Sequence, residues 1–380
     1  VQAATYASTL RFSKVGGILD QSLLPGSANA PPKGTVGAKH DVFSTTTGGL
    51  WVLRQSSNFG YMSVLPGDRE ASIVTRGTYV SYDWLTDLNI GLSHGPTGAL
   101  VHSGFMTSWA GFKDELDKFL NAHRNLQTIH CVGHSLGGAL ATLNAAYVKK
   151  MRPATEVKLY TIGCPRVGCR DFAKEVEHLL GVNNIKRTYN IADPVPMIAK
   201  WPFVHTPTAY DGIVVGGRTF CLISPSGHFM DTYGKLMGSN SWADLERLSA
   251  GVVPDNMIAT WLEGIQSGLT VVTPGGAMAF KMLGLALQYL IKIAMGVVSV
   301  ALTAGLTLID WCAMLLERAW EISQKVGYLV ESSMIAVMKF FGQVYVKGVN
   351  LTAQFLRYVL RMINQMVATL AIQAMRGLYR

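Results

Sequence analysis

The chain has 380 residues, of which 15% are charged and 49% hydrophobic, and it carries a net charge of +9 with a mean hydropathy of +0.24. This length allows one large domain with an additional region, or two domains. Residues 275–380 hold 10 basic and only 4 acidic residues, and no RNA-binding or finger-like motif accompanies them, so the composition favours anionic lipid over nucleic acid as a partner.

The N-terminal part contains few regular elements. A short helix is predicted over residues 5–24, and the Pro/Gly/Ala-rich stretch 24–40 is typical of a surface loop. Three short β-like runs follow, separated by glycine, proline and polar turns: 49–55, 59–65 and 71–77.

From residue 111 onward, helical and strand-like segments alternate. Amphipathic or alanine-rich sequence predicts helices over 111–123, 137–151 and 169–180. Apolar runs predict buried strands at 128–134, 157–163 and 185–191. Such strands, interleaved with helices, indicate an α/β fold whose sheet is buried on both faces.

The C-terminal part has a different character. No proline occurs after Pro274, and residues 293–309 contain no charge. This uncharged stretch is slightly shorter than the roughly 20 apolar residues that a membrane span needs. Between Met334 and Leu370, apolar residues recur mostly every three, four or seven positions, which predicts an amphipathic helix. Two interpretations stay open: helices that pack on each other or on the α/β part, and helices that lie on or cross a membrane.

The stretch "TIHCVGHSLGGALATLNAAYV" (128–148) combines an apolar strand, the pattern Gly-x-Ser-x-Gly and an alanine-rich helix. A nucleophile elbow needs these parts in this order, with small residues beside the serine so that a strained turn can form. The hydroxyl of Ser135 would then lie at the carboxyl edge of the sheet, near a helix N-terminus that favours an oxyanion.

Five blocks of sequence, in this order, resemble those of the class 3 lipases, the fungal-lipase-like branch of the α/β-hydrolases: "TRGTYVSYDWLTDL" (75–88), "VHSGFMTSW" (101–109), "VGHSLGGALATL" (132–143), "YTIGCPRVG" (160–168) and "YNIADPVPMI" (189–198). The resemblance extends over about residues 45–240. It implies an α/β-hydrolase fold with a mainly parallel central sheet, followed by an all-helical apolar region. We therefore expect an N-terminal extension (1–44), a catalytic domain (45–250) and a helical, basic region that associates with a membrane or a partner (251–380).

The resemblance implies a catalytic triad. Ser135 matches the family nucleophile, and Asp193 in "ADPVP" matches the acid, in the chain order Ser, Asp, His. His228 in "SGHFMDTY" resembles the family's closing "H…Y" segment and is the expected base, whereas His205 in "PFVHTP" is expected to be a structural or pocket residue. His134 is expected to pack around the elbow and to point away from the hydroxyl.

The same resemblance implies an oxyanion hole and a lid. The backbone N–H of Leu136 and the amide and hydroxyl of Thr78 match the two oxyanion donors. The segment after Thr78 occupies the position of the family's lid, and its apolar residues Trp84, Leu85 and Leu88 would form a face that opens onto lipid.

These residues predict a serine hydrolase that cleaves acyl esters of membrane lipids through an acyl-enzyme. Five scattered cysteines without metal-like Cys/His spacing indicate neither a disulfide framework nor a metal site, and no cofactor is expected. Between triglyceride and phospholipid, the basic apolar tail favours phospholipid on an anionic membrane.

A second interpretation is a membrane-disrupting toxin or effector. A lipase without a visible signal peptide, joined to an apolar helical tail, resembles bacterial lipase effectors that are injected into neighbouring cells. The tail would then insert in a membrane, bind a delivery chaperone or be covered by an immunity protein, and the protein would be membrane-associated, secreted or delivered. Non-enzymatic alternatives are a pore-former and a pseudo-hydrolase, although the intact Ser/Asp/His set argues against the latter.

Overall fold

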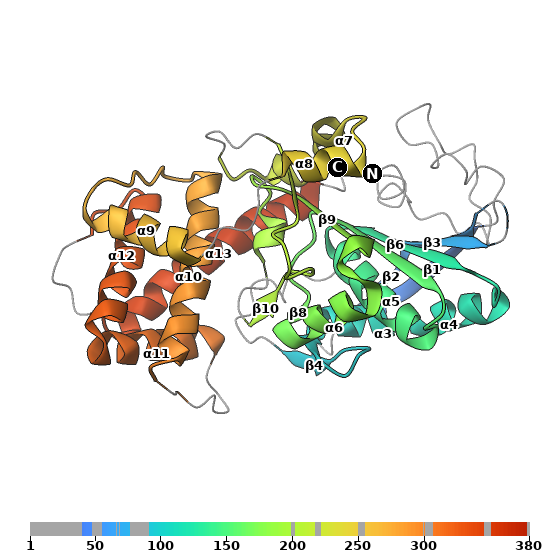
Figure 1. Cartoon of the computed structure of the whole chain (residues 1–380), viewed down its shortest axis with the longest axis horizontal. Helices are drawn as coiled ribbons and strands as arrows, with labels where there is room; N and C mark the ends of the chain where they lie inside the picture. The colour runs from blue at the N-terminus through green and yellow to red at the C-terminus, as the bar shows by residue number, and fades with distance from the viewer. Residues whose placement is uncertain are drawn as a thin grey trace.

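The computed structural model describes residues 40–47, 55–65, 67, 69–76, 91–198, 202–216, 222–249, 255–298, 300, 307–345 and 351–377. The predicted helix at 5–24, nearly all of the predicted strand at 49–55, Thr78 and the predicted lid lie outside these residues. In Figure 1 an α/β part lies beside a group of helices from the C-terminal third of the chain.

The described residues form a seven-stranded main sheet in the order β1-β2-β3-β6-β7-β9-β11. Pairing is antiparallel from β1 to β3 and parallel from β3 to β11. This mainly parallel sheet has the α/β-hydrolase architecture that the sequence predicts. Its strands are β1 (His40–Thr47), β2 (Gln55–Val64), β3 (Glu70–Thr75), β6 (Thr128–His134), β7 (Glu156–Ile162), β9 (Ile185–Asn190) and β11 (Ile213–Val215).

The central strand β6 is buried on both faces. Ile129 and Cys131 belong to the apolar cluster that includes the helix α5, whereas Val132 belongs to a cluster with residues of β11 and α7. Helices connect and cover the parallel strands, as the apolar runs of the sequence predict. They are α3 (Ser103–Ala110), α4 (Lys113–Ala122), α5 (Leu136–Met151), α6 (Arg170–Leu180), α7 (Met230–Met237) and α8 (Trp242–Leu248).

A smaller four-stranded sheet has the order β10-β8-β5-β4. These strands are short: β4 (Leu92–His94), β5 (Leu100–His102), β8 (Gly168–Cys169) and β10 (Phe203–Val204). Three 3-10 turns complete the α/β part, namely η2 (Val182–Asn184), η3 (Val195–Met197) and η4 (Pro225–His228). The turns η3 and η4 matter for the site, because they follow or contain two of its predicted residues.

Five helices make up the described C-terminal part: α9 (Asp255–Gln266), α10 (Ala277–Met295), α11 (Leu308–Ile322), α12 (Gln324–Phe340) and α13 (Ala353–Gly377). Their buried apolar side chains form one large cluster, which also includes Val195 and Ile198 of the α/β part. The helices therefore pack both on each other and on the segment that carries η3 (Figure 1).

The uncharged segment 293–309 is not one helix. α10 ends at Met295, where Gly296 caps it, and α11 begins at Leu308 after a capping box formed by Thr307 and Asp310. Of the helices that the structure describes, α10 alone has the length and apolar composition to cross a membrane, which is weak evidence because helices in a soluble core pass the same test.

One predicted boundary needs correction. Residues 40–44 were expected in an N-terminal extension, but they belong to β1, which pairs with β2 along its whole length in the main sheet. The polar sequence "HDVFSTTT" alternates weakly, and its strand conformation depends on pairing with β2 rather than on an apolar pattern of its own. Residues 40–44 therefore belong to the main sheet.

Candidate active site

Ser135 occupies a strained turn between β6 and α5. Its φ of 59° and ψ of −134° make it the only residue other than glycine with a positive φ in the described parts of the chain. Its backbone N–H donates to the carbonyl of Ile162 at 3.0 Å, and its own carbonyl accepts from Gly138 N–H at 2.9 Å. A side chain held in this way projects from the strand-to-helix junction, as a nucleophile elbow requires.

The two glycines of the motif are needed for close backbone approach. A Cβ on Gly133 would lie 2.0 Å from the carbonyl oxygen of Gly137, and a Cβ on Gly137 would lie 2.2 Å from the carbonyl oxygen of Thr75. The hydroxyl of Thr75 also donates to the Gly137 carbonyl at 2.6 Å. Side chains at positions 133 or 137 would therefore force β3, β6 and α5 apart.

The structure joins Ser135, His228 and Asp193 in one hydrogen-bonded chain. Nε2 of His228 lies 2.8 Å from Oγ of Ser135, and Nδ1 lies 2.8 Å from Oδ2 of Asp193. All three residues are fully buried. With Nδ1–H donating to Asp193, Nε2 is left to accept the serine proton. Asp193 follows β9, and His228 ends the turn η4.

Two further groups hold the carboxylate of Asp193. The hydroxyl of Tyr233 donates to Oδ2 at 2.7 Å, and the backbone N–H of Val195 donates to Oδ1 at 2.8 Å. The Tyr233 oxygen in turn accepts from the backbone N–H of Asn190 at 2.9 Å. Burial, followed by the charge of Asp193, raises the pKa of Tyr233 well above its usual value, so the phenol keeps its proton and remains a donor. Tyr233 is the tyrosine of the "H…Y" segment seen in the sequence, but its contact with Asp193 was not predicted.

His134 lies against the histidine of the triad. Its ring stacks on that of His228 with centroids 4.5 Å apart, and its Nε2 donates to the His228 backbone carbonyl at 2.9 Å. Burial, followed by the proximity of His228, lowers the pKa of His134 well below its usual value. The neutral ring packs beside the elbow, as expected, and additionally fixes the backbone of η4.

Of the other predicted site residues, the structure describes Leu136 and His205. Leu136 is buried at the first position of α5, directly after the serine. His205 lines a cavity beside α10, and Asp193 borders the same cavity. Thr78 and the lid residues Trp84, Leu85 and Leu88 lie outside the described residues. Within the described residues, no group of three His, Cys, Asp or Glu side chains could hold a metal ion.

The C-terminal helix α13 packs against both η3 and η4. Gly377, at the end of α13, lies against the ring of Phe229, and a Cβ there would come within 2.5 Å of that ring. Val195 in η3 is buried in the same cluster as the C-terminal helices. The loops that carry Asp193 and His228 are therefore supported by a segment that the sequence resemblance does not cover.

Part of the chain is similar in sequence to a known family and to several known proteins. The family described as lipase (class 3) matches residues 72–203. The chain is 32% identical over 157 residues to phospholipase A(1) DAD1, chloroplastic, from Arabidopsis thaliana, a match that covers 33% of this chain and 35% of that protein. It is 31% identical over 163 residues to secreted mono- and diacylglycerol lipase 1 from Fusarium solani, covering 41% and 47%.

A third relative has a different described role. The chain is 36% identical over 101 residues to toxin TseL from Vibrio cholerae, a match that covers 27% of this chain and 15% of the toxin. The chain spans less than half the length of each of these three relatives.

Proposed function

We propose that the protein is a serine hydrolase that cleaves acyl esters of lipids, because residues 72–203 match the class 3 lipase family. The observation that carries this proposal is the buried chain of two 2.8 Å hydrogen bonds from Ser135 through His228 to Asp193. A serine hydroxyl becomes a nucleophile only when a neighbouring base takes its proton, and this arrangement supplies such a base.

In the proposed reaction, Oγ of Ser135 attacks the ester carbonyl carbon while its proton moves to Nε2 of His228. The tetrahedral intermediate collapses when His228 gives that proton to the leaving alcohol, and an acyl-enzyme remains. Water then attacks the acyl carbonyl with His228 as the base, which releases the fatty acid and restores Ser135. Asp193 keeps the imidazole in the required tautomer and stabilises its positive charge.

The backbone N–H of Leu136 is the proposed first donor to the oxyanion. It lies at the N-terminus of α5, where the free amides and the helix dipole favour negative charge. Thr78 is proposed as the second donor from the family resemblance. Each such donor contributes roughly 3 kcal/mol of transition-state stabilisation. Trp84, Leu85 and Leu88 remain the proposed lid.

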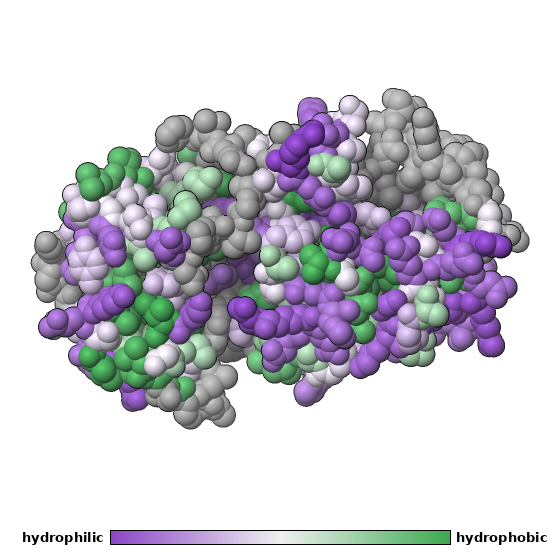
Figure 2. Space-filling view, viewed as in Figure 1, coloured by the Kyte–Doolittle hydropathy of each residue, from purple (hydrophilic) through white to green (hydrophobic). Residues whose placement is uncertain are grey.

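We propose phospholipid in an anionic membrane as the substrate. The basic C-terminal helices favour such a surface, and large apolar side chains are strongly exposed at Leu269, Val271 and Val344. Figure 2 shows apolar side chains over much of the visible face of the C-terminal helices, whereas the α/β part is more hydrophilic there. Binding through these side chains would bring the α/β part to the lipid surface.

A role as a delivered toxin is the second candidate function. The observation that favours it is the 36% identity to toxin TseL over 101 residues. In this proposal the enzyme is secreted or delivered, attacks the lipids of a target membrane, and is held inactive by an immunity protein or carried by a chaperone.

The test compares the wild-type protein with Ser135→Ala on anionic phospholipid liposomes and on emulsified triglyceride. Fatty acid, lysolipid and dye leakage are recorded together, and Ser267→Ala, at an exposed serine directly after α9, is the control. We expect Ser135→Ala to lose fatty acid release and Ser267→Ala to keep it. Equal release by Ser135→Ala would overturn the proposal, and leakage without release would support a pore-former instead.

A further inference from the structure

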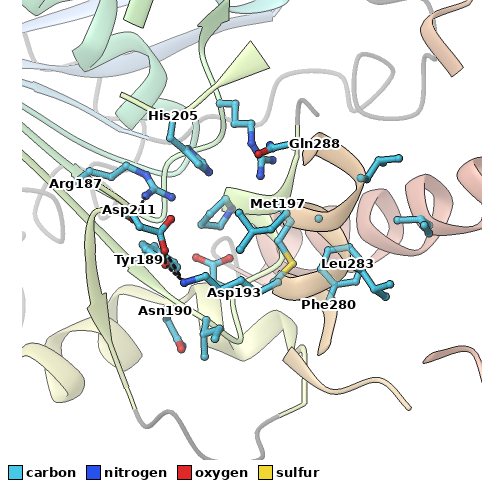
Figure 3. A pocket seen from close by; sticks show the side chains of 18 residues that line it. Arg187, Tyr189, Asn190, Asp193, Met197, His205, Asp211, Phe280, Leu283 and Gln288 are labelled. Atoms are coloured by element: carbon cyan, nitrogen blue, oxygen red, sulfur yellow. Dashed lines mark hydrogen bonds and ion pairs between the residues drawn. The ribbon is translucent and has the colours of Figure 1, made fainter. Parts of the chain in front are cut away.

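A cavity lies where the loops after β9 meet helix α10. Arg166, Arg187, Asp211 and His205 line it from the α/β part, and Phe280 and Leu283 line it from α10 (Figure 3). The hollow encloses about 880 Å³ when the open solvent at its mouth is included. Asp193 borders it, but Ser135 and His228 do not, so the cavity lies behind the proposed triad.

Two guanidinium groups in this cavity lack a carboxylate partner among the described residues. Arg187 is 3% exposed, its Nη1 donates only to the backbone carbonyl of Asp211 at 2.6 Å, and its Nε has no hydrogen-bond acceptor. Arg166 donates only to the backbone carbonyl of Ile198, at 3.3 Å. The carboxylate of Asp211 is instead occupied by Lys281 of α10 at 2.5 Å and by the hydroxyl of Tyr189 at 2.7 Å.

The charges around the cavity leave one positive charge in excess. Three cations, Arg166, Arg187 and Lys281, face two carboxylates, Asp193 and Asp211. The carboxylate of Asp211 is paired with Lys281, and the carboxylate of Asp193 accepts from His228 and Tyr233, so neither is hydrogen-bonded to an arginine. Burying an unpaired cation is costly, and a ligand that carries a single negative charge would remove that cost.

The guanidinium group of Arg166 keeps its charge at neutral pH. Burial, followed by the charge of Arg187, lowers the pKa of Arg166 to about 10, which still leaves the guanidinium protonated. Burial and the two arginines lower the pKa of His205 well below its usual value, so this ring is neutral. The positive charge at this wall therefore belongs to Arg166 and Arg187 rather than to His205.

The wall formed by α10 is mainly apolar, and it also contains Lys281 and Gln288. Phe280, Leu283 and Leu287 of α10 line the cavity together with Met197 and Ile363. Figure 3 shows Phe280 and Leu283 on the side away from Arg187. Gly284 lies in the same wall, and a Cβ added there would meet nothing within 4 Å. A cationic wall opposite an apolar wall matches a molecule with an anionic end and a hydrocarbon chain.

We propose that this cavity binds a single-chain amphiphile with a monoanionic head, a long-chain fatty carboxylate, with its carboxylate at Arg166 and Arg187 and its chain along α10. The guanidinium groups offer the paired donors that a carboxylate accepts. The bound molecule would join the α/β part to α10 next to the existing Lys281–Asp211 ion pair. This site is separate from the proposed ester-cleaving position at Ser135.

The test measures displacement of a fluorescent fatty acid, cis-parinarate, in the full chain carrying Ser135→Ala, so that binding does not depend on catalysis. Oleate should displace the probe, whereas oleyl alcohol and inorganic phosphate should not. Displacement by oleyl alcohol as effective as that by oleate would overturn the proposal, because the arginines would then contribute nothing. Displacement by inorganic phosphate, or by lysophosphatidate more strongly than by oleate, would assign the cavity to a phosphate group instead.

Two pairs of variants locate the binding. Arg166→Gln should weaken oleate binding at least tenfold, whereas Arg124→Gln, an exposed arginine distant in sequence from the cavity walls, should not change it. Gly284→Leu should fill the space and abolish binding while keeping the fold, because leucine is a better helix former than glycine. Gly284→Ala should retain binding. Unchanged oleate affinity in both Arg166→Gln and Gly284→Leu would overturn the assignment.

Discussion

Replacing Tyr233 by phenylalanine tests how the carboxylate of Asp193 is held. The change removes a 2.7 Å hydrogen bond to Asp193 Oδ2 and leaves the buried N–H of Asn190 without its acceptor. A hydrogen bond to a charged group contributes about 1.5–3 kcal/mol, and a buried unsatisfied donor costs about 1–3 kcal/mol. We therefore expect Tyr233→Phe to lower the free energy of unfolding by about 4 kcal/mol.

The same change should also slow catalysis. With one donor removed, the Asp193 carboxylate has more rotational freedom, so the imidazole of His228 is less well oriented toward Ser135. We expect kcat/KM for a soluble p-nitrophenyl ester to fall about tenfold, which corresponds to about 1.4 kcal/mol of transition-state stabilisation. Urea unfolding followed by circular dichroism gives the stability change in parallel.

The control is Tyr358→Phe, because Tyr358 is 54% exposed on α13. This variant should change the unfolding free energy by less than about 0.5 kcal/mol. If Tyr233→Phe were as stable and as active as Tyr358→Phe, the contact between Tyr233 and Asp193 would have no energetic role, and the reasoning would be refuted.

Three other changes follow from the structure. Gly163→Ala should abolish activity and sharply reduce stability, because Gly163 has a φ of 57° and a Cβ there would lie 2.7 Å from Oδ2 of Asp193. Soluble expression and ester hydrolysis measure these effects, and a fully active variant would contradict the prediction. Gly377→Leu should displace Phe229 and lower kcat through the neighbouring turn η4, and normal kcat would show that α13 does not support the site. Burial lowers the pKa of His102 to about 4. Below pH 6.5 the unfolded chain therefore binds a proton at this histidine that the folded chain does not bind. The free energy of unfolding should consequently fall by up to about 3 kcal/mol between pH 6.5 and pH 4. His102→Asn should flatten this part of the urea-midpoint profile, and an unchanged slope would refute the assignment.

The sequence predicts the elbow well because all its determinants are contiguous. The strand, Ser135 and the following helix occupy one stretch, and small residues at 133 and 137 are visible in the sequence itself. The last of the five blocks predicts Asp193 and the later "H…Y" segment predicts His228, and the structure brings these two residues to hydrogen-bond distance of one another. The parallel strands between 128 and 191 were likewise predicted, because buried strands have continuous apolar runs.

The remaining features depend on contacts between distant segments. The donor from Tyr233 to Asp193 and the stacking of His134 on His228 need the tertiary fold before they can be seen. β1 was missed because its polar sequence has strand conformation only through pairing with β2. For the C-terminal helices, periodicity shows an apolar face but does not say what covers that face, so their packing on the turn η3 could not be predicted.

The most direct test of the central proposal is covalent labelling of Ser135. The full-length protein is treated with an alkyl fluorophosphonate, which reacts with an activated serine, and its peptides are analysed by mass spectrometry. A single phosphonate adduct on Ser135, absent after heat denaturation and strongly reduced in Asp193→Asn, is the predicted result. Labelling of a different serine, or no labelling of the folded protein, would contradict it.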